Sequence, residues 1–336
     1  MEKRKLGNSD LKVSVIGMGC WQFAGGKMWG EQEERDSKKA VDAALDSGIN
    51  LFDTAEGYGN GSSEEVLGRA LKGKRDKAVI ATKASGPTFA PDELRDACEG
   101  SLRRLDTDYI DLYQLHWPRQ KAVSHEIIIE GVRQLQKEGK IRYFGVCNYG
   151  PGDLSRSLPA EEEEPEARVV SNQLAYSLLW RSIEYEVVPI CMSHNIGILT
   201  YSTLIHGLLT GKYLTPEEFP GIRARTLHFS SNRDEVRHGQ EGQEELTFRT
   251  LREIKSACDE AGTDMVTAAY GWAVHQPGIT SVLAGARNKE QVKMNALAGT
   301  YSFPGGFIEK LTDVTAELRR AFGAHLDMWE VPGRIS

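Results

Sequence analysis

The sequence predicts a (β/α)8 TIM barrel preceded by a short β-hairpin. Eight short apolar runs alternate with stretches of helical periodicity, which indicates parallel strands joined by right-handed crossovers. The length of 336 residues suits one such barrel, and eight units fit a closed barrel better than an open doubly wound sheet. No linker divides the chain, so residues 1–336 are expected to form a single domain.

The eight apolar runs are the predicted barrel strands. They are rich in Ile, Val, Leu and aromatic residues, and several are nearly continuous, as expected for strands that are buried on both faces. In chain order they are residues 13–19, 49–54, 78–83, 108–117, 141–148, 167–173, 196–202 and 279–285.

Three of the intervening segments carry clear helix boundaries. The first segment, residues 33–48, places three alanines on one face and stops at Gly48, which is a C-cap signal. The segment 91–105 begins with proline and has acidic residues in its first turn, as helix N-termini do. The segment 126–140 ends in Lys-Glu-Gly-Lys, a combination typical of a helix C-terminus.

The remaining segments are predicted to be a hairpin and two loops. Residues 4–14 indicate two strands that turn at Gly7 and Asn8, placed to plug the bottom of the barrel. The acidic run within 158–167 is predicted to be a solvated loop tip. Residues 215–245 form the longest stretch without periodicity, and in a barrel such a loop is a candidate lid.

Composition and charge exclude several classes of protein. A net charge of −7 argues against a nucleic-acid or anionic-membrane partner and leaves a small-molecule substrate. We see no signal peptide and no apolar stretch near the ~20 residues of a membrane helix. Five widely spaced cysteines without a C-x-x-C pair, and no zinc motif, indicate small buried residues in a reduced cytoplasmic protein with no metal. A monomer or weak homo-oligomer is expected.

Four polar residues follow the predicted strands at the points where they end. Asp53, Lys83 and His116 each close an apolar run, and Tyr58 lies in the turn after Asp53. Taken singly, each is more commonly a packed or solvated residue. In a parallel barrel, however, the carboxyl ends of the strands meet at one face, where active sites form. The four are therefore expected to converge as a catalytic site.

These residue types suit the protonation of a carbonyl that is being reduced. Hydride addition leaves an alkoxide, and tyrosine can protonate it although its ordinary pKa is near ~10. The ammonium of Lys83 is expected to lower the pKa of Tyr58, while Asp53 holds Lys83 charged and in place. His116 can donate a hydrogen bond to the carbonyl oxygen.

The chain resembles the aldo-keto reductase family from about residue 4 to residue 300, with similarity to its bacterial and plant-type members. This resemblance implies an (α/β)8 barrel that binds NADPH in an extended pose, with Tyr58 as acid, Asp53 and Lys83 as its tuning pair and His116 as the carbonyl-orienting residue. The motifs that carry it are D-T-A-x-x-Y-G, the strand-end Lys, L-H-W-P, G-V-C-N (145–148), S-N-Q (171–173), T-Y-S-T-L (200–204), G-L-L-T-G-K-Y (207–213) and G-A-R-N-K-E-Q-x-x-x-N (285–295).

The same resemblance implies the cofactor contacts. Asn148 and Gln173 match residues that hold the nicotinamide carboxamide, and Tyr201 matches the aromatic on which the ring stacks. Arg287 matches the 2′-phosphate site, and because an arginine fork suits a phosphate dianion, NADP is expected over NAD. The full expected set is Gly19, Cys20, Trp21, Asn148, Gln173 and Tyr201, then Ser202, Leu204 and Lys212 at the pyrophosphate, Gly285, Ala286 and Arg287 at the 2′-phosphate, and Gln291 and Asn295 at the adenine.

Trp21, Trp29 and Trp117 lie near the strand tops and are expected to wall the substrate pocket. Aromatic walls suit sugars, ring ketones and aryl aldehydes alike, so they do not select a substrate.

Three functions remain open at this point. We expect an NADPH-dependent reductase of aldehydes or ketones. Because hydride transfer is reversible, an NADP-dependent sugar, polyol or alcohol dehydrogenase working in the oxidative direction is the main alternative. A non-catalytic NADP-sensing subunit is the third, since potassium-channel β-subunits share the fold and the cofactor site. His116 keeps the reductase pattern where those subunits usually differ.

Overall fold

The protein is described here by a computed structural model that covers residues 1–27, 29–163, 167–329 and 335. Its centre is a closed barrel of parallel strands in the order β10-β3-β4-β5-β6-β7-β8-β9, and each predicted apolar run overlaps one of these strands. The predicted barrel is therefore confirmed. The barrel strands are β3 (Ile16–Gly19), β4 (Leu51–Asp53), β5 (Val79–Ala84), β6 (Ile110–Leu115), β7 (Ile141–Cys147), β8 (Val169–Ala175), β9 (Gly197–Tyr201) and β10 (Ile279–Gly285).

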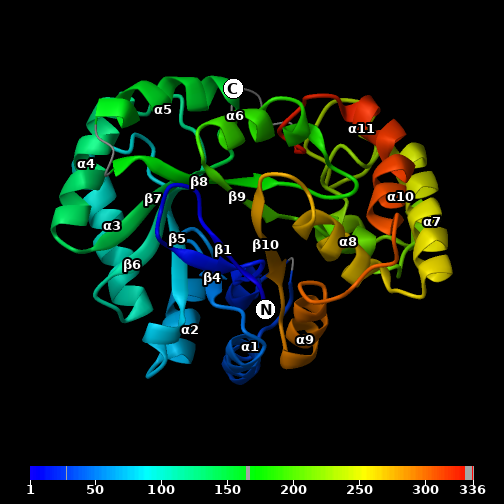
Figure 1. Ribbon diagram of the computed structural model, residues 1–336, viewed down its shortest axis with the longest axis horizontal. Coiled ribbons are helices and arrows are strands. Elements are labelled where there is room, and N and C mark those ends of the chain that lie inside the picture. The colour runs from blue at the N-terminus through cyan, green and yellow to red at the C-terminus, as the bar shows by residue number, and fades with distance from the viewer. Residues whose placement is uncertain (28, 164–166, 330–334, 336) are drawn as a thin grey trace.

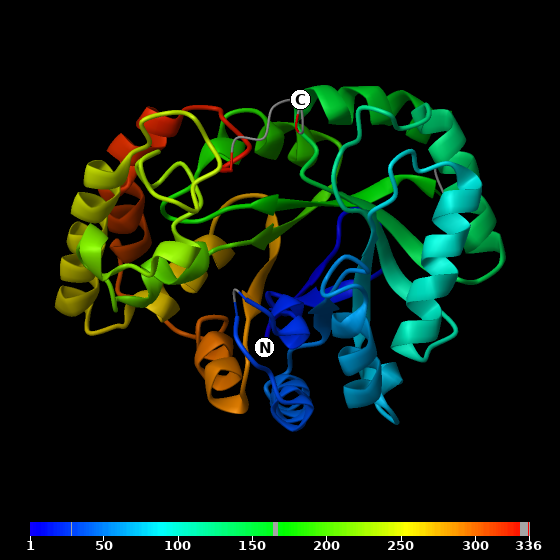
Figure 2. The ribbon, with the colours of Figure 1, turned by 180° about the vertical axis from the view of Figure 1, so that it is seen from behind.

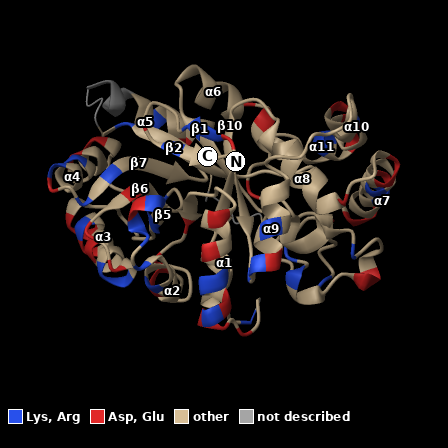
Figure 3. Ribbon diagram, turned by 60° about the horizontal axis from the view of Figure 1, so that its bottom comes forward, with Lys and Arg blue, Asp and Glu red and all other residues tan. Residues whose placement is uncertain are grey.

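Helices surround these strands in both views of the ribbon (Figure 1, Figure 2). Acidic and basic residues are interspersed along outer helices such as α1 and α3 (Figure 3). The helices are α1 (Glu34–Asp46), α2 (Ser62–Leu71), α3 (Pro91–Leu105), α4 (His125–Lys137), α5 (Pro151–Glu163), α6 (Val187–Ser193), α7 (Glu244–Ala261), α8 (Met265–Val274), α9 (Lys289–Leu297), α10 (Phe307–Val314) and α11 (Ala316–Phe322).

The predicted helix boundaries are confirmed. Gly48 follows the end of α1 with a φ of 80°, a left-handed conformation that glycine adopts without steric cost. Proline is the first residue of α3, and α4 ends at Lys137. Among the residues that the structure describes, no helix combines the length and apolar character needed to cross a bilayer. All five cysteines are buried and free, as predicted.

One loop prediction was wrong and another is confirmed. Residues 158–163 belong to α5 and do not form a loop tip, because glutamate has a high helix propensity and an acidic run can extend a helix. Residues 164–166 of that predicted loop lie outside the described residues. The stretch before α7 is irregular as predicted, with the short 3-10 turns η6 (Pro216–Glu218) and η7 (Gly221–Arg223).

The N-terminal hairpin closes the bottom of the barrel. Its strands β1 (Lys3–Lys5) and β2 (Lys12–Ser14) pair antiparallel. At the turn, Gly7 has a φ of 50°, and a Cβ there would lie 2.3 Å from the carbonyl oxygen of Val170, so only glycine lets the hairpin approach so closely. Hairpin and strand side chains share one buried apolar cluster, Leu6, Leu11, Val13, Leu51, Val79, Ala81, Leu112, Val170, Leu199 and Leu283.

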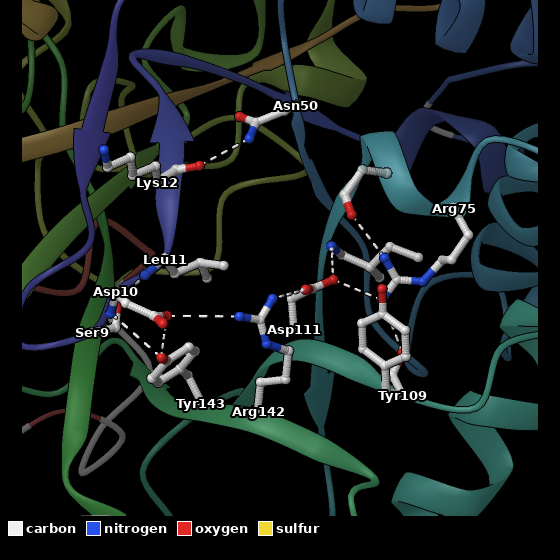
Figure 4. A network of polar contacts seen from close by, with 12 residues as sticks. Ser9, Asp10, Leu11, Lys12, Asn50, Arg75, Tyr109, Asp111, Arg142 and Tyr143 are labelled. Atoms are coloured by element: carbon white, nitrogen blue, oxygen red, sulfur yellow. Dashed lines mark hydrogen bonds and ion pairs between the residues drawn. The ribbon is translucent and has the colours of Figure 1, made fainter.

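A polar network around Asp111 joins the same end of the barrel to the hairpin (Figure 4). Asp111 is 2% exposed, and its carboxylate accepts hydrogen bonds from Arg75 at 2.7 Å and from Arg142 at 3.0 Å. It also accepts the backbone N–H of Ile80 at 3.0 Å. Arg142 reaches on to Asp10 in the hairpin turn at 3.7 Å. The buried carboxylate thus connects β5, β6, β7 and the hairpin.

We predict that Asp111→Ala lowers the free energy of unfolding by about 2–4 kcal/mol, because it leaves two arginines without their buried partner. The urea midpoint measures this loss. The matched control is Asp10→Ala, which removes a carboxylate that is 77% exposed and is expected to cost less than about 1 kcal/mol. Equal losses in the two variants would contradict the role given to the buried carboxylate.

Candidate active site

The four polar residues at the predicted strand ends lie together at the C-terminal face of the barrel. Asp53 is the last residue of β4, Lys83 is the next-to-last of β5, and His116 directly follows β6. Tyr58 lies in the turn after β4. Since β4, β5 and β6 are neighbours in the barrel, their ends bring these side chains within reach of one another.

Lys83 is the centre of this group. Its side chain is fully buried, and its Nζ donates to Asp53 Oδ1 at 2.7 Å, to the backbone oxygen of Thr54 at 2.8 Å and to the Tyr58 hydroxyl at 3.3 Å. An ammonium has three N–H donors, and each of them has an acceptor here. The charge is therefore both buried and fully hydrogen-bonded, which fixes the Tyr58 hydroxyl relative to Asp53.

The second oxygen of Asp53 is held by two side-chain amides. Gln173 donates to Oδ2 at 2.7 Å, and Gln114 donates to the same atom at 3.4 Å. Gln114 was not predicted from the sequence, although a polar residue inside a predicted apolar strand is a usable signal; the structure shows it fully buried. Gln173, expected to face the nicotinamide, also serves here to orient Asp53.

Burial outweighs the ammonium in setting the acidity of Tyr58. Burial raises the pKa of Tyr58 to about 12, although the nearby Lys83 charge acts to lower it. Lys83 therefore acts in the predicted direction, but burial outweighs it, and the extent of desolvation cannot be read from the sequence. Burial also disfavours the charged form of Lys83, but Asp53, Tyr58 and Cys147 together outweigh it and the pKa of Lys83 is raised. The pair thus holds a protonated phenol beside a charged ammonium.

His116 lies beside this pair. Its ring centroid is 5.6 Å from that of Tyr58 in an edge-to-face arrangement. Its Nδ1 is 3.2 Å from the hydroxyl oxygen of Ser85, a residue that the sequence analysis did not single out. The amide of Asn148 donates to the backbone oxygen of His116 at 3.1 Å.

The three predicted tryptophans lie in a row of aromatic rings with Tyr58 and His116. Trp29 contacts Trp21 at 5.3 Å between centroids, and Trp21 stacks on Tyr58 at 5.8 Å. On the other side, Trp117 stacks on His116 at 6.4 Å. The row places apolar aromatic surface on both sides of the Tyr58 and His116 rings.

Trp329, near the C-terminus, extends this row. Its ring lies 6.1 Å from Trp117 and is nearly parallel to Tyr201 at 6.3 Å, with an angle of 10°. Trp329 was not predicted from the sequence, because it is remote in the chain from every other part of the site and no local pattern marks it.

The residues expected at the nicotinamide lie at the ends of three adjacent strands. Asn148 follows β7, Gln173 lies in β8, and Tyr201 ends β9. The Tyr201 hydroxyl donates to Asn148 Oδ1 at 2.7 Å. The backbone N–H of Asn148 donates to the backbone oxygen of Gln173 at 2.8 Å. Asn148 adopts a left-handed φ of 62°, a conformation that asparagine tolerates better than most residues.

The residues expected at the phosphate and adenine lie together where β10 meets α9. The backbone N–H of Arg287 donates to Gln291 at 2.8 Å, and Asn295 donates to the Gly285 oxygen at 3.1 Å. The Arg287 guanidinium donates to the side-chain oxygen of Gln32 at 3.0 Å and to a backbone oxygen of the same loop. Ala286 is buried between them. The structure therefore brings this predicted group together.

The segment expected at the pyrophosphate is a strained turn. Ser202 and His206 have φ values of 55° and 52°, which are unusual for residues other than glycine. Leu204 lies within this turn, and Lys212 is exposed after it. Such a run of left-handed residues curls the backbone after β9.

The structure does not support a thiol contact between Cys20 and a cofactor. Its side chain is fully buried. Its backbone N–H donates to the backbone oxygen of Asp53, and its backbone oxygen accepts from the Ser63 hydroxyl. Burial also raises the pKa of the Cys20 thiol well above its ordinary value. Its neighbours Gly19 and Trp21 are both accessible, and Trp21 is 37% exposed.

Comparisons with known proteins identify the family of the chain. The sequence profile of the Aldo/keto reductase family matches residues 15–315. Aldo-keto reductase YhdN of Bacillus subtilis is 34% identical over 308 residues, which cover 87% of each chain. A probable voltage-gated potassium channel subunit beta of Arabidopsis thaliana is 27% identical, covering 89% of this chain and 91% of its own. The predicted similarity to potassium-channel β-subunits is therefore confirmed.

Solved structures share the fold over nearly the whole chain. The glycerol dehydrogenase AKR11B4 of Gluconobacter oxydans has a TM-score of 0.77 at 30% identity, covering 94% of this chain and 95% of its own. An aldo/keto reductase of Klebsiella pneumoniae, solved in complex with NADP and acetate, has a TM-score of 0.70 at 26% identity, covering 100% and 98%. The chain is therefore an oxidoreductase that belongs to the aldo/keto reductase family.

Proposed function

We propose that the protein is an NADPH-dependent carbonyl reductase that transfers hydride to an aldehyde or ketone, with Tyr58 as the proton donor. The observation that carries this proposal is the 3.3 Å contact between the Tyr58 hydroxyl and the fully buried Lys83 ammonium. A proton donor must be protonated before the reaction and stabilised after it. Burial provides the first condition, and the fixed positive charge provides the second.

Each residue has one task in the reaction. NADPH, when bound, supplies the hydride. As charge develops on the carbonyl oxygen, His116 donates a hydrogen bond to that oxygen and orients it. Tyr58 transfers its proton to the same oxygen, and the Lys83 ammonium stabilises the phenolate that remains. Asp53 keeps Lys83 charged and in place.

The residues at the mouth of the barrel fit NADPH. Arg287 is held by neutral oxygens, and no carboxylate in the described part of the chain pairs with it. An arginine whose charge is not neutralised by a carboxylate suits the dianionic 2′-phosphate that distinguishes NADPH from NADH. The amides of Asn148 and Gln173 would hold the carboxamide of the nicotinamide, and Tyr201 would support its ring.

The oxidative direction is the second candidate, and the likeness to a glycerol dehydrogenase structure favours it. In that direction the same residues act in reverse, because the Tyr58 phenolate would accept the proton of an alcohol. With its pKa raised to about 12, Tyr58 is protonated at neutral pH, which is the state that reduction requires.

We predict that Tyr58→Phe lowers kcat for carbonyl reduction by about 100- to 10,000-fold, because it removes the proton and little packing volume. NADPH affinity should stay within about threefold, since the hydroxyl is assigned to the substrate oxygen. Steady-state NADPH oxidation with aromatic aldehydes, cyclic ketones, dicarbonyls and sugars measures the first, and fluorescence titration measures the second. Tyr185→Phe, an exposed tyrosine outside the site, is the control. Near-normal turnover in Tyr58→Phe would refute the assignment.

The pH dependence of the two directions should differ. Because the folded-state pKa of Tyr58 is raised from 10.0 to about 12, the phenol stays protonated as the pH rises through 10. Deprotonation of Tyr58 should therefore not reduce kcat/KM for reduction between about pH 7 and about pH 10, whereas kcat/KM for oxidation should rise with pH over the same range. A reductive profile that falls in native protein with a midpoint below about pH 9 would contradict this state of Tyr58.

We predict that Arg287→Ala weakens NADPH binding about 10- to 100-fold and NADH binding less than about threefold, because only NADPH carries the 2′-phosphate. Dissociation constants from fluorescence titration of both cofactors test this. Lys289→Ala is the matched control, since that exposed cation faces Glu290 at 3.7 Å and is not assigned to the cofactor. Equal loss for NADPH and NADH in Arg287→Ala would refute the phosphate role.

A further inference from the structure

We propose that Ser85 is a positioning residue for His116, whose hydroxyl donates to Nδ1 and so holds the imidazole proton on Nε2. The inference rests on the proposed role of His116 as donor to the carbonyl oxygen. Its starting observation is the 3.2 Å distance between Ser85 Oγ and His116 Nδ1. Ser85 follows β5 and His116 follows the adjacent strand β6. The backbone N–H of His116 donates to the backbone oxygen of Ala84 at 2.9 Å, which fixes the position of the two residues relative to each other along the barrel.

The chemistry of a neutral imidazole gives this contact its direction. Such a ring has one N–H donor and one bare nitrogen that accepts. If Nδ1 carried the proton, Nε2 would present a lone pair and could not donate to a carbonyl oxygen. A serine hydroxyl can donate to a bare Nδ1, and that arrangement keeps the proton on Nε2. The role assigned to His116 therefore requires Ser85 to be the donor.

Side chains form hydrogen bonds with both the backbone N–H and the carbonyl oxygen of Ser85. Its N–H donates to Glu56 Oε1 at 2.6 Å, and its carbonyl oxygen accepts from Arg119 at 3.0 Å. Glu56 comes from the turn between Asp53 and Tyr58, and Arg104 lies 3.9 Å from its second oxygen. Glu56 thus links the turn that carries the proton donor to the residue that touches His116. A hydroxyl on a backbone held in this way has a defined direction.

The test combines turnover with direct observation of the tautomer. Ser85→Ala should lower kcat/KM for carbonyl reduction about three- to tenfold, with the affinity for NADPH unchanged. Ser85→Thr keeps the hydroxyl and should restore most of the loss. Ser155→Ala, which removes an exposed serine hydroxyl on α5, is the control. The tautomer of His116 is read by long-range proton–nitrogen correlation in protein labelled with ¹⁵N-histidine, and its signals among the eight histidines are identified by their absence in His116→Gln.

Native protein should show His116 protonated on Nε2 alone, and Ser85→Ala should show a mixture of tautomers. Native protein with the proton on Nδ1 would overturn the inference without any variant. An unchanged tautomer and unchanged kcat/KM in Ser85→Ala would overturn it as well. The tautomer is measured without turnover, so a failure of the proposed function, seen as turnover that survives Tyr58→Phe, is distinguishable from a failure of this inference.

Discussion

The buried ammonium of Lys83 is the interaction on which the C-terminal face of the barrel depends. A charge without access to water is tolerable only when every donor has an acceptor, and here the acceptors come from Asp53, Thr54 and Tyr58. Asp53 must in turn be oriented by Gln173 and Gln114. The demand for hydrogen-bonding partners therefore spreads from one residue across four strands, β4, β5, β6 and β8, and fixes the geometry of the site.

The two ends of the barrel solve the same physical problem for different purposes. At the bottom, the buried Asp111 carboxylate is surrounded by arginines and ties the hairpin to three strands. At the top, the buried Asp53 carboxylate is surrounded by an ammonium and amides. The first arrangement ties the hairpin to the barrel, while the second fixes the Tyr58 hydroxyl beside the Lys83 ammonium. This separation suits a barrel, whose catalytic residues gather at the C-terminal face.

The sequence sufficed for the barrel and for the convergence of the four polar residues, because strand periodicity and strand ends are local features. It failed at α5, where an acidic run was interpreted as a loop although glutamate favours helix. It also did not reveal that burial outweighs Lys83 and raises the pKa of Tyr58, since desolvation depends on what covers the phenol. Ser85 and Trp329 were missed because their roles arise only from contacts between distant segments, whereas Gln114 carried a local signal as a polar residue inside an apolar strand.

The row of indoles at the mouth of the barrel also determines the optical properties of the protein. Four of the six tryptophans, Trp21, Trp29, Trp117 and Trp329, lie in this row, while the other two, Trp180 and Trp272, are fully buried elsewhere. A reduced nicotinamide absorbs in the near ultraviolet, where indoles emit. The proposed binding site is therefore bordered by its own energy donors, and the intrinsic fluorescence of the protein reports events at this mouth more than events in the core.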